Sequence, residues 1–195
     1  MAPAKPLSAG PTTAPGEACP SWVHEDNVFS TRRRMDWAHR PIVVLAARTL
    51  EGCAGSVLDL GCGNGALLRK IHAHALRTTP FGIDREADRI EHARALLPRF
   101  ATNFVAGDLF DPSILPASPE RFALAVLTPR RLLEAGPEKS ADFLGRLRPR
   151  CDRLLIYAYG TGLTQFGDLV GFARAAGILL DAGEATARAA IARRF

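Results

Sequence analysis

Alternate glycines follow a short apolar run in the first third of the chain. The run is Val57–Leu60, and it leads directly into Gly61, Gly63 and Gly65. Glycines let the backbone turn tightly and let a ligand approach the main chain, while the first turn of a following helix offers unpaired N–H groups. The spacing therefore predicts a strand, a loop and a helix that together cradle a nucleotide-like ligand.

Two classes of cofactor use such a loop. The segment Gly61-x-Gly63-x-x-Ala66 satisfies the dinucleotide pattern with its permitted final alanine. The chain also carries Asp59 two residues before the first glycine and repeats glycine at position 65, which gives Asp-x-Gly-x-Gly-x-Gly. Asp84 and Asp108 follow the next two apolar runs, and an open α/β sheet places its ligand contacts at such strand ends.

The glycine segment resembles motif I of the class I S-adenosylmethionine-dependent methyltransferases, and the likeness covers roughly residues 37–195. Phe81–Asp84 and Val105–Leu109 are similar to the two segments that follow in this family. The resemblance implies that Asp59 holds the methionine amino group, that Asp84 accepts hydrogen bonds from the ribose hydroxyls, and that Asp108 takes the adenine amino group. It favours a methyl donor over a nicotinamide dinucleotide.

The predicted cofactor site includes the neighbours of these motif residues. Some of these residues also have a purely structural interpretation. An aspartate after a strand can cap the next helix, and Cys62 can serve only to pack the loop. The predicted cofactor-binding residues are Asp59, Gly61, Cys62, Gly63, Asn64, Gly65, Asp84, Arg85, Gly107, Asp108, Leu109 and Thr128.

No residue stands out as a catalyst. Displacement at an activated sulfonium needs mainly correct placement of the nucleophile and the methyl group. The turn Thr128–Arg130 lacks the amide and the aromatic residue of the Asn- or Asp-Pro-Pro-aromatic turn in amino methyltransferases, so base N-methylation is disfavoured. The groups that could remove a proton from an acceptor are His24, His39, Tyr157 and Tyr159.

Trp37 and His39 lie in the segment before the first strand, which in this superfamily often covers the methyl-donor pocket. Both are candidates for the substrate pocket. The competing interpretations are core packing for Trp37 and a surface position at a helix end for His39.

The pattern of the chain predicts an α/β fold with a doubly wound, mainly parallel sheet of about seven strands and helices on both faces. Short apolar runs alternate with helical stretches. The expected strands are Val57–Leu60, Pro80–Ile83, Asn103–Ala106, Ala123–Leu127 and Leu154–Tyr159, and the expected helices are about Gly65–Ala75, Ala87–Leu97, Leu132 to beyond Phe143, and Gln165–Ala176.

The ends of the chain are organised differently. Residues 1–21 are predicted to form a flexible tail, 22–51 a helical lid and 52–195 the cofactor-binding domain. In the lid, Ser30 or Thr31 caps one helix, and Pro41 begins a second that reaches Leu50. Residues 178–195 form either two strands, Ile178–Glu184 and Ala187–Arg193, or one helix.

Composition limits the classes of function. The 195 residues are 47% hydrophobic and 23% charged, and no apolar run approaches the roughly 18 residues of a membrane helix, so we expect a cytoplasmic protein without a membrane partner. The four cysteines show no metal-ligand spacing, and no metal site is predicted. The net charge of +5 permits nucleic-acid binding, although the arginine-rich composition is typical of GC-rich coding.

These observations predict S-adenosylmethionine-dependent methyl transfer to a small-molecule acceptor, a metabolite or natural product. The alternatives are an RNA or protein methyltransferase and a cofactor-binding protein without transfer activity. The acceptor, the acceptor atom and the oligomeric state do not follow from the sequence.

Overall fold

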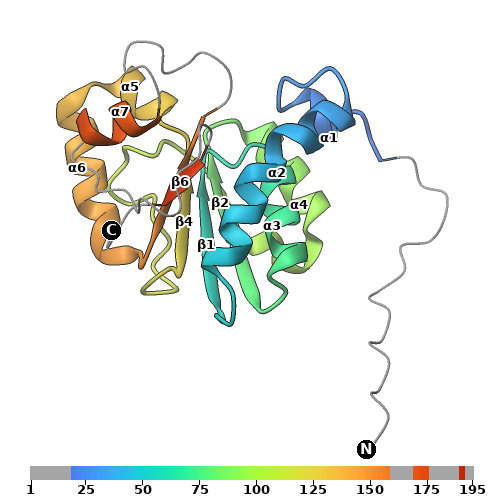
Figure 1. Ribbon diagram of the computed structural model, residues 1–195, viewed down its shortest axis with the longest axis horizontal. Coiled ribbons are helices and arrows are strands. Elements are labelled where there is room, and N and C mark those ends of the chain that lie inside the picture. Colours follow the sequence, from blue (N-terminus) through green and yellow to red (C-terminus); the bar gives the residue numbers. More distant parts are fainter. Residues whose placement is uncertain (1–18, 159–168, 176–188, 192–195) are drawn as a thin grey trace, which may run out of the picture.

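A single sheet forms the centre of the computed structural model, which describes residues 19–158, 169–175 and 189–191 (Figure 1). Its strands in this part of the chain are β1 (Gly55–Leu60), β2 (Thr78–Asp84), β3 (Phe104–Ala106), β4 (Leu124–Leu127), β5 (Leu154–Tyr157) and β6 (Ala189–Ile191). Their order in the sheet is β3-β2-β1-β4-β5-β6. The strands from β3 to β5 are parallel to their neighbours, and β6 is antiparallel to β5.

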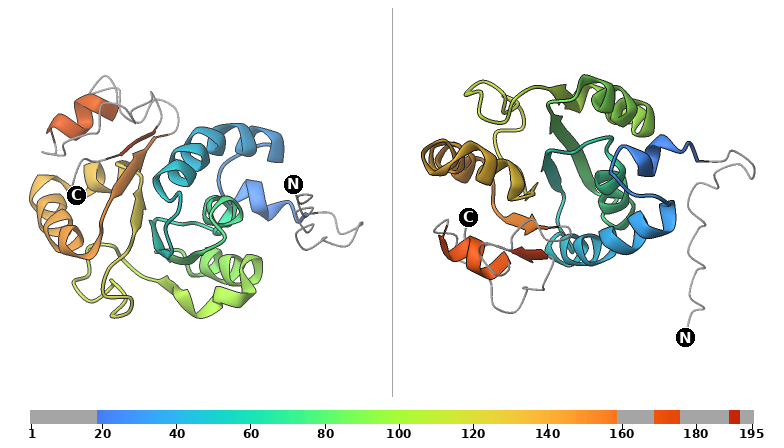
Figure 2. Two further views of the ribbon diagram at one scale, coloured as in Figure 1. Left: turned by 60° about the horizontal axis from the view of Figure 1, so that its bottom comes forward. Right: turned by 90° about the horizontal axis from the view of Figure 1, so that it is seen from above.

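Helices cover both faces of this sheet (Figures 1 and 2). They are α1 (Trp22–Glu25), α2 (Arg32–Thr49), α3 (Ala66–His74), α4 (Ala87–Leu96), α5 (Arg130–Ala135), α6 (Pro137–Leu147) and α7 (Leu169–Ala175), with 3-10 turns η1 (Pro98–Asn103) and η2 (Arg148–Arg150). Helices α2, α3 and α4 lie on one face, and α5, α6 and α7 on the other. The predicted doubly wound architecture is thus confirmed, with six strands in the described residues where about seven were expected.

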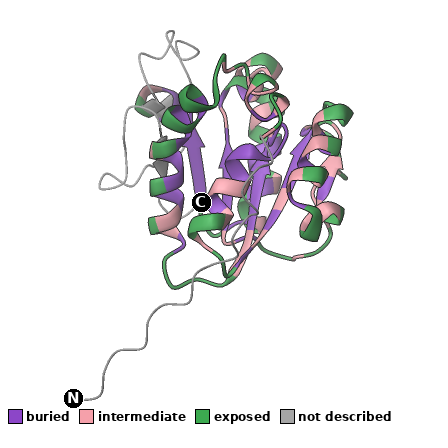
Figure 3. Ribbon diagram, turned by 90° about the vertical axis from the view of Figure 1, so that its right-hand side faces the viewer, coloured by how far each residue is buried: buried purple, intermediate pink, exposed green. Residues whose placement is uncertain are grey.

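The strands are buried on both faces of the sheet, which explains why their sequences are nearly continuous apolar runs. Along β1, Val57 packs with the α2–α4 side, whereas Leu58 and Leu60 pack with the α5–α7 side. The strands are buried throughout their centre, while the outer faces of the helices are exposed (Figure 3). Because side chains alternate along a strand, β1, β4 and β5 each contribute to both hydrophobic clusters.

The order of the strands reverses between β1 and β4. The chain proceeds outward from β1 through β2 to β3, and then returns to place β4 on the other side of β1. In open parallel sheets the crevice outside the carboxyl ends of such strands is where ligands bind. The fold therefore directs attention to the residues that follow β1, β2, β3 and β4.

The segment before β1 differs from the expectation at Pro41. Thr31 caps α2 as predicted, because its side chain accepts a hydrogen bond from the Arg34 N–H. Pro41 does not begin a second helix but lies inside α2. A proline in a helix removes one hydrogen bond, and burial of residues on both sides of it, including Met35 and Ile42, keeps the helix continuous.

The segment after β4 also differs from its predicted form. One helix from Leu132 past Phe143 was expected, but α5 and α6 are separated at Gly136, whose φ of +85° is outside the helical region. Pro137 then occupies the first position of α6, where its missing N–H is tolerated.

Several expectations fall on residues outside the described ranges. They concern most of the predicted tail, Tyr159, the first part of the helix Gln165–Ala176 and the strand Ile178–Glu184. Within the second predicted C-terminal strand, Ala189–Ile191 does form β6.

Further features concern the described residues alone. None of their helices has the length and apolar character needed to cross a bilayer. In the same residues, no group of three or more His, Cys, Asp or Glu side chains is arranged to hold a metal ion. All four cysteines are free thiols.

Candidate cofactor site

The glycine loop joins β1 to α3 at the carboxyl edge of the sheet. Gly61, Gly63 and Gly65 have φ values of +89°, +54° and +73°, a region that residues with side chains rarely adopt. The Gly61 and Cys62 N–H groups donate to the Ile83 carbonyl oxygen over 2.8 and 3.0 Å, which fixes the loop to the end of β2. The glycines are thus required by the backbone conformation that the sequence pattern predicted.

An open cleft of about 290 Å³ lies beside this loop. Six of the predicted cofactor residues line it: Gly61, Asp84, Arg85, Gly107, Asp108 and Leu109. They come from the loops after β1, β2 and β3, which are neighbours in the sheet. The cleft is also lined by residues that the sequence did not indicate: Phe110, Arg131, Glu134, Ala135 and Lys139.

Asp84 connects the loops that form the cleft. Its carboxylate accepts hydrogen bonds from the Gly63 N–H over 2.8 Å and from the Glu86 N–H over 3.0 Å. Its main-chain carbonyl accepts from the Gly107 N–H over 2.9 Å. The side chain is 7% exposed and still lines the cleft, so it can both hold the glycine loop and meet a ligand.

Asp108 is an exposed carboxylate of the cleft. One of its oxygens accepts a hydrogen bond from the Phe110 N–H over 3.1 Å, which shapes the turn after β3. Leu109 next to it is buried, and Phe110 packs against the ring of Phe143 from α6. The cleft therefore combines a polar group with apolar walls at this end.

Asp59 is fully buried near the end of β1, and neither of its carboxylate oxygens has a hydrogen-bond partner in the described residues. Burial, with a smaller contribution from the negative charge of Asp84, raises the pKa of the Asp59 carboxyl from 3.8 to about 8. Buried polar groups are nearly always paired. An unpaired carboxylate at this position fits a cationic group of a bound ligand.

The remaining loop residues do not line the cleft. Cys62 is 4% exposed and packs in the core between α3 and the sheet, which confirms the packing interpretation. Gly65 allows close packing, because a Cβ there would lie 3.2 Å from that of Ala93. The side chain of Asn64, predicted to meet the cofactor, is instead bound to the segment that contains α1. Thr128 is half-buried after β4.

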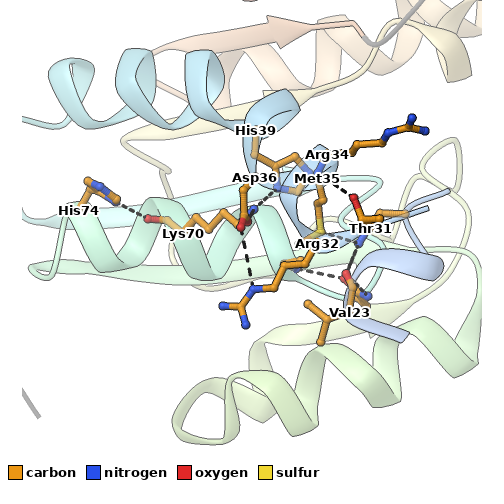
Figure 4. Close-up of polar contacts among 12 residues, drawn as sticks. Val23, Thr31, Arg32, Arg34, Met35, Asp36, His39, Lys70 and His74 are labelled. Atoms are coloured by element: carbon orange, nitrogen blue, oxygen red, sulfur yellow. Dashed lines mark hydrogen bonds and ion pairs between the residues drawn. The ribbon is translucent and has the colours of Figure 1, made fainter. Parts of the chain in front are cut away.

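Trp37 was expected in the core and His39 on the surface, and the structure shows the reverse for both. Trp37 is 64% exposed, so the core-packing prediction is wrong, and His39 is 2% exposed, so the surface prediction is wrong. His39 Nδ1 lies 3.1 Å from Nζ of Lys70, which forms a 2.6 Å ion pair with Asp36 (Figure 4). Burial, with Lys70 adding its charge, lowers the pKa of His39 to about 3.

The lower pKa makes His39 a neutral side chain that ties α2 to α3. None of the cleft's lining residues is Trp37 or His39. Their positions in the middle of α2 reflect the continuous helix, because the predicted break at Pro41 would have placed them near a helix end.

The fold and the glycine loop define a Rossmann-like domain with an open cleft at the carboxyl edge of its sheet. A family model described as a methyltransferase domain matches residues 57–148, from β1 to the start of η2. A search of curated proteins found no match. Residues 57–148 thus match a methyltransferase domain, and the fold of the chain agrees with the class I, Rossmann-like resemblance read from the glycine segment.

Solved structures with the same fold include the following three neighbours. The bifunctional kinase–methyltransferase WbdD has a TM-score of 0.59 and 20% identity, covering 90% of this chain and 42% of that chain. The plantazolicin methyltransferase BpumL, bound to a desmethyl-plantazolicin analogue and S-adenosylhomocysteine, has a TM-score of 0.52 and 19% identity, covering 73% and 53%. DesVI of Streptomyces venezuelae has a TM-score of 0.52 and 23% identity, covering 70% and 57%. This chain thus spans about half the length of these neighbours.

Proposed function

We propose that this protein binds S-adenosylmethionine and transfers its methyl group to a small-molecule acceptor. The observation that carries the proposal is the set of three carboxylates, Asp59, Asp84 and Asp108, at the ends of three adjacent strands. One of them, Asp59, is buried without a partner beside the glycine loop. The arrangement suits a ligand with hydroxyl and amino donors at one end and a cation at the other.

Each carboxylate suits one part of the methyl donor. Asp108 lies against the apolar wall of Leu109 and Phe110, where an adenine ring would bind with its amino group toward the carboxylate. Asp84 faces the cleft at the end of β2 and would accept hydrogen bonds from the ribose. Asp59 would pair with the ammonium group of the methionine end, and the bound donor would supply an activated methyl group.

The same features argue against a nicotinamide dinucleotide. A dinucleotide would bring two phosphates to the glycine loop, next to the Asp84 carboxylate that accepts the Gly63 N–H. Like charges at such short range are unfavourable in a partly buried site. Titration with NAD+ therefore serves as the negative comparison.

The small-molecule acceptor rests on two supports. BpumL acts on plantazolicin and shares the fold of this chain. The turn after β4, Thr128–Arg130, offers no side-chain amide to hold the amino group of a nucleobase. Since methyl transfer depends mainly on placement, the absence of an assigned base is compatible with the reaction.

The experiment is calorimetric titration with S-adenosylhomocysteine. Asp84→Ala should weaken binding about 10- to 100-fold, the effect of removing hydrogen bonds to a charged group. Asp88→Ala, an exposed aspartate one helical turn further along the chain, is the matched control and should bind like the wild type. Equal affinities of the two variants would refute the assignment of Asp84 to the ribose. Absence of binding to the wild type would refute the proposal itself.

Transfer itself is tested with a methyl-labelled donor. In a single turnover with an extract of small metabolites, label should move into a low-molecular-weight product. Binding of the donor without transfer to this fraction would favour the cofactor-binding protein without activity. Label in RNA or in protein would favour the corresponding macromolecular acceptor.

RNA is the second candidate acceptor because of the outer face of α2. Arg33, Trp37, Arg40, Val44 and Arg48 form one exposed stripe at helical spacing. The three arginines make no ion pair within the described residues, and Trp37 is 64% exposed. A tryptophan between guanidinium groups can stack on a base while the arginines neutralise phosphates.

A labelled single-stranded RNA tests this stripe by fluorescence anisotropy. The double variant Arg33→Glu, Arg40→Glu should lose binding, while Arg99→Glu, Arg153→Glu, with the same change in charge at other exposed sites, should retain it. Equal loss in both variants would indicate a general effect of charge and would leave the small-molecule acceptor as the sole proposal.

A further inference from the structure

The segment Ser21–Phe29 is bound to the glycine loop by the side chain of Asn64. Asn64 is fully buried, and its amide donates to the carbonyl oxygens of Trp22 and Val23 over 2.9 and 3.2 Å and lies 3.2 Å from the Asp26 carboxylate. Its side-chain oxygen accepts from the Ala66 N–H over 3.2 Å. These bonds join the start of α3 to the segment that contains α1.

A second contact fixes the segment to α4. His92 Nδ1 lies 2.7 Å from the Asp26 carboxylate. The His92 ring is stacked on Trp22, with 4.3 Å between the ring centroids and 13° between the planes. The segment is therefore held from two helices, beside the start of α2 (Figure 1).

Asn27 is oriented by these contacts. Its amide nitrogen donates to the Asn64 side-chain oxygen over 2.8 Å and to the Val23 carbonyl over 3.0 Å, which uses both of its hydrogens. The side-chain oxygen of Asn27 must then point the other way, and it lies 3.0 Å from where a Cβ of Gly63 would be. Among the described residues no donor binds this oxygen, which leaves an acceptor directed at the glycine loop.

The backbone next to Asn27 is strained. Val28 has a φ of +60° and is 89% exposed. A β-branched residue is a genuine outlier in this region, and such strain persists where the surroundings impose it, frequently at ligand sites. The turn that follows Asn27 is thus held in an unfavourable conformation that keeps the asparagine over the loop.

We propose that Asn27 is a further methyl-donor-binding residue, whose side-chain oxygen accepts a hydrogen bond from the ammonium group at the methionine end. Asn64 acts through Asn27 as its positioning residue. The inference rests on the proposed function, since it assigns one more contact to the same donor. It makes the segment around α1 part of the binding site, a role that the cleft residues alone do not reveal.

The unpartnered acceptor oxygens near the loop favour the ammonium group as the partner. The methionine end carries an ammonium and a carboxylate. A carbonyl oxygen is only an acceptor, and Asp59, two residues before the loop, presents two further acceptor oxygens without partners. A carboxylate has no donor to offer the Asn27 oxygen, whereas an ammonium has three donors and can bind both residues.

The test compares two ligands that differ only at this end. S-adenosylhomocysteine carries the amino acid, and 5′-methylthioadenosine has the same adenosyl sulfur without it. Asn27→Ala should weaken binding of S-adenosylhomocysteine about 10- to 100-fold in calorimetry and leave the affinity for methylthioadenosine within about twofold. Asn64→Ala should reproduce the selective loss if it folds.

The control is Asn103→Ala, another half-buried asparagine that donates to a main-chain carbonyl, that of Pro80, over 3.0 Å. It should bind both ligands like the wild type. Equal weakening of both ligands by Asn27→Ala would indicate a structural role and overturn the inference, as would no weakening of either. Wild-type protein that binds neither ligand would instead refute the proposed function itself.

Discussion

Replacing Asp59 by asparagine should stabilise the ligand-free protein near neutral pH, although it removes a central group of the site. The carboxyl is fully buried without a partner, and its pKa is raised from 3.8 to about 8. At pH 7 the folded chain must therefore keep a proton on Asp59 that the unfolded chain releases. Asparagine has almost the same shape and no charge, so it avoids this cost.

The sign and the range follow from proton linkage. Between pH of about 4 and 8, the raised pKa of Asp59 lowers the free energy of unfolding by up to about 1.4 kcal/mol for each pH unit gained. His39 acts in the opposite direction, because its pKa is lowered from 6.5 to about 3, so its contribution rises with pH below 6.5. The two effects offset each other below pH 6.5. Between pH 6.5 and 8 Asp59 acts alone, and the loss reaches about 2 kcal/mol.

Urea unfolding at several pH values measures this difference. The wild type should lose about 2 kcal/mol of unfolding free energy from pH 6.5 to 8, while Asp59→Asn should stay flat in this range. Removing the carboxyl gains about 4 kcal/mol at pH 7, and burying an unpaired amide in its place costs part of this gain. The variant should therefore be more stable than the wild type by about 1–3 kcal/mol at pH 7. A flat wild-type profile, or a less stable variant at pH 7, would refute the reasoning.

Three further substitutions test other parts of the structure. As the pH falls from 6.5 to 4.5, His39→Gln should gain about 2–3 kcal/mol of unfolding free energy relative to the wild type, and parallel urea profiles would contradict the neutral buried histidine. Gly82→Ala should lower the free energy of unfolding by about 1–3 kcal/mol, because its Cβ would lie 2.7 Å from Cys62 Sγ; an unchanged melting temperature would exclude this crowding. Gly63→Val should abolish binding of S-adenosylhomocysteine in calorimetry while circular dichroism retains the folded spectrum, because its φ is +54° and its Cβ would press on Asn27 Oδ1; unchanged affinity would remove the loop from the site.

The sequence predicted the sheet well because its strands are buried on both faces. A run such as Val57–Leu60 is apolar at nearly every position, and the helices between such runs are long enough to be recognised. The breaks within helices were not predictable in the same way. Pro41 and Gly136 are both residues that interrupt helices, but burial around Pro41 overrides its local preference and nothing does so at Gly136.

The cleft residues that follow the strands could be predicted because their position depends on strand order and on the glycine pattern. Arg131, Glu134 and Lys139 could not, since they reach the cleft only through the way α5 and α6 fold back over it. The prediction that Asn64 contacts the cofactor failed for a related reason. Its place inside the glycine segment indicated a ligand contact, whereas its partners lie about 40 residues earlier in the chain and leave no signal in the local pattern.

Asp59 near the end of β1 and Asn64 in the glycine loop contribute to ligand binding in two different ways. Asn64 is satisfied by protein atoms, so it adds rigidity before any ligand arrives. Asp59 is unsatisfied, so it lowers the stability of the free protein and gains a partner only in the complex. A ligand at 100 times its dissociation constant stabilises the folded state by about 2.7 kcal/mol, which offsets a large part of the penalty of about 4 kcal/mol at Asp59 at pH 7. The buried carboxylate therefore acts as a site kept ready for a cation, with its cost offset when the cation binds.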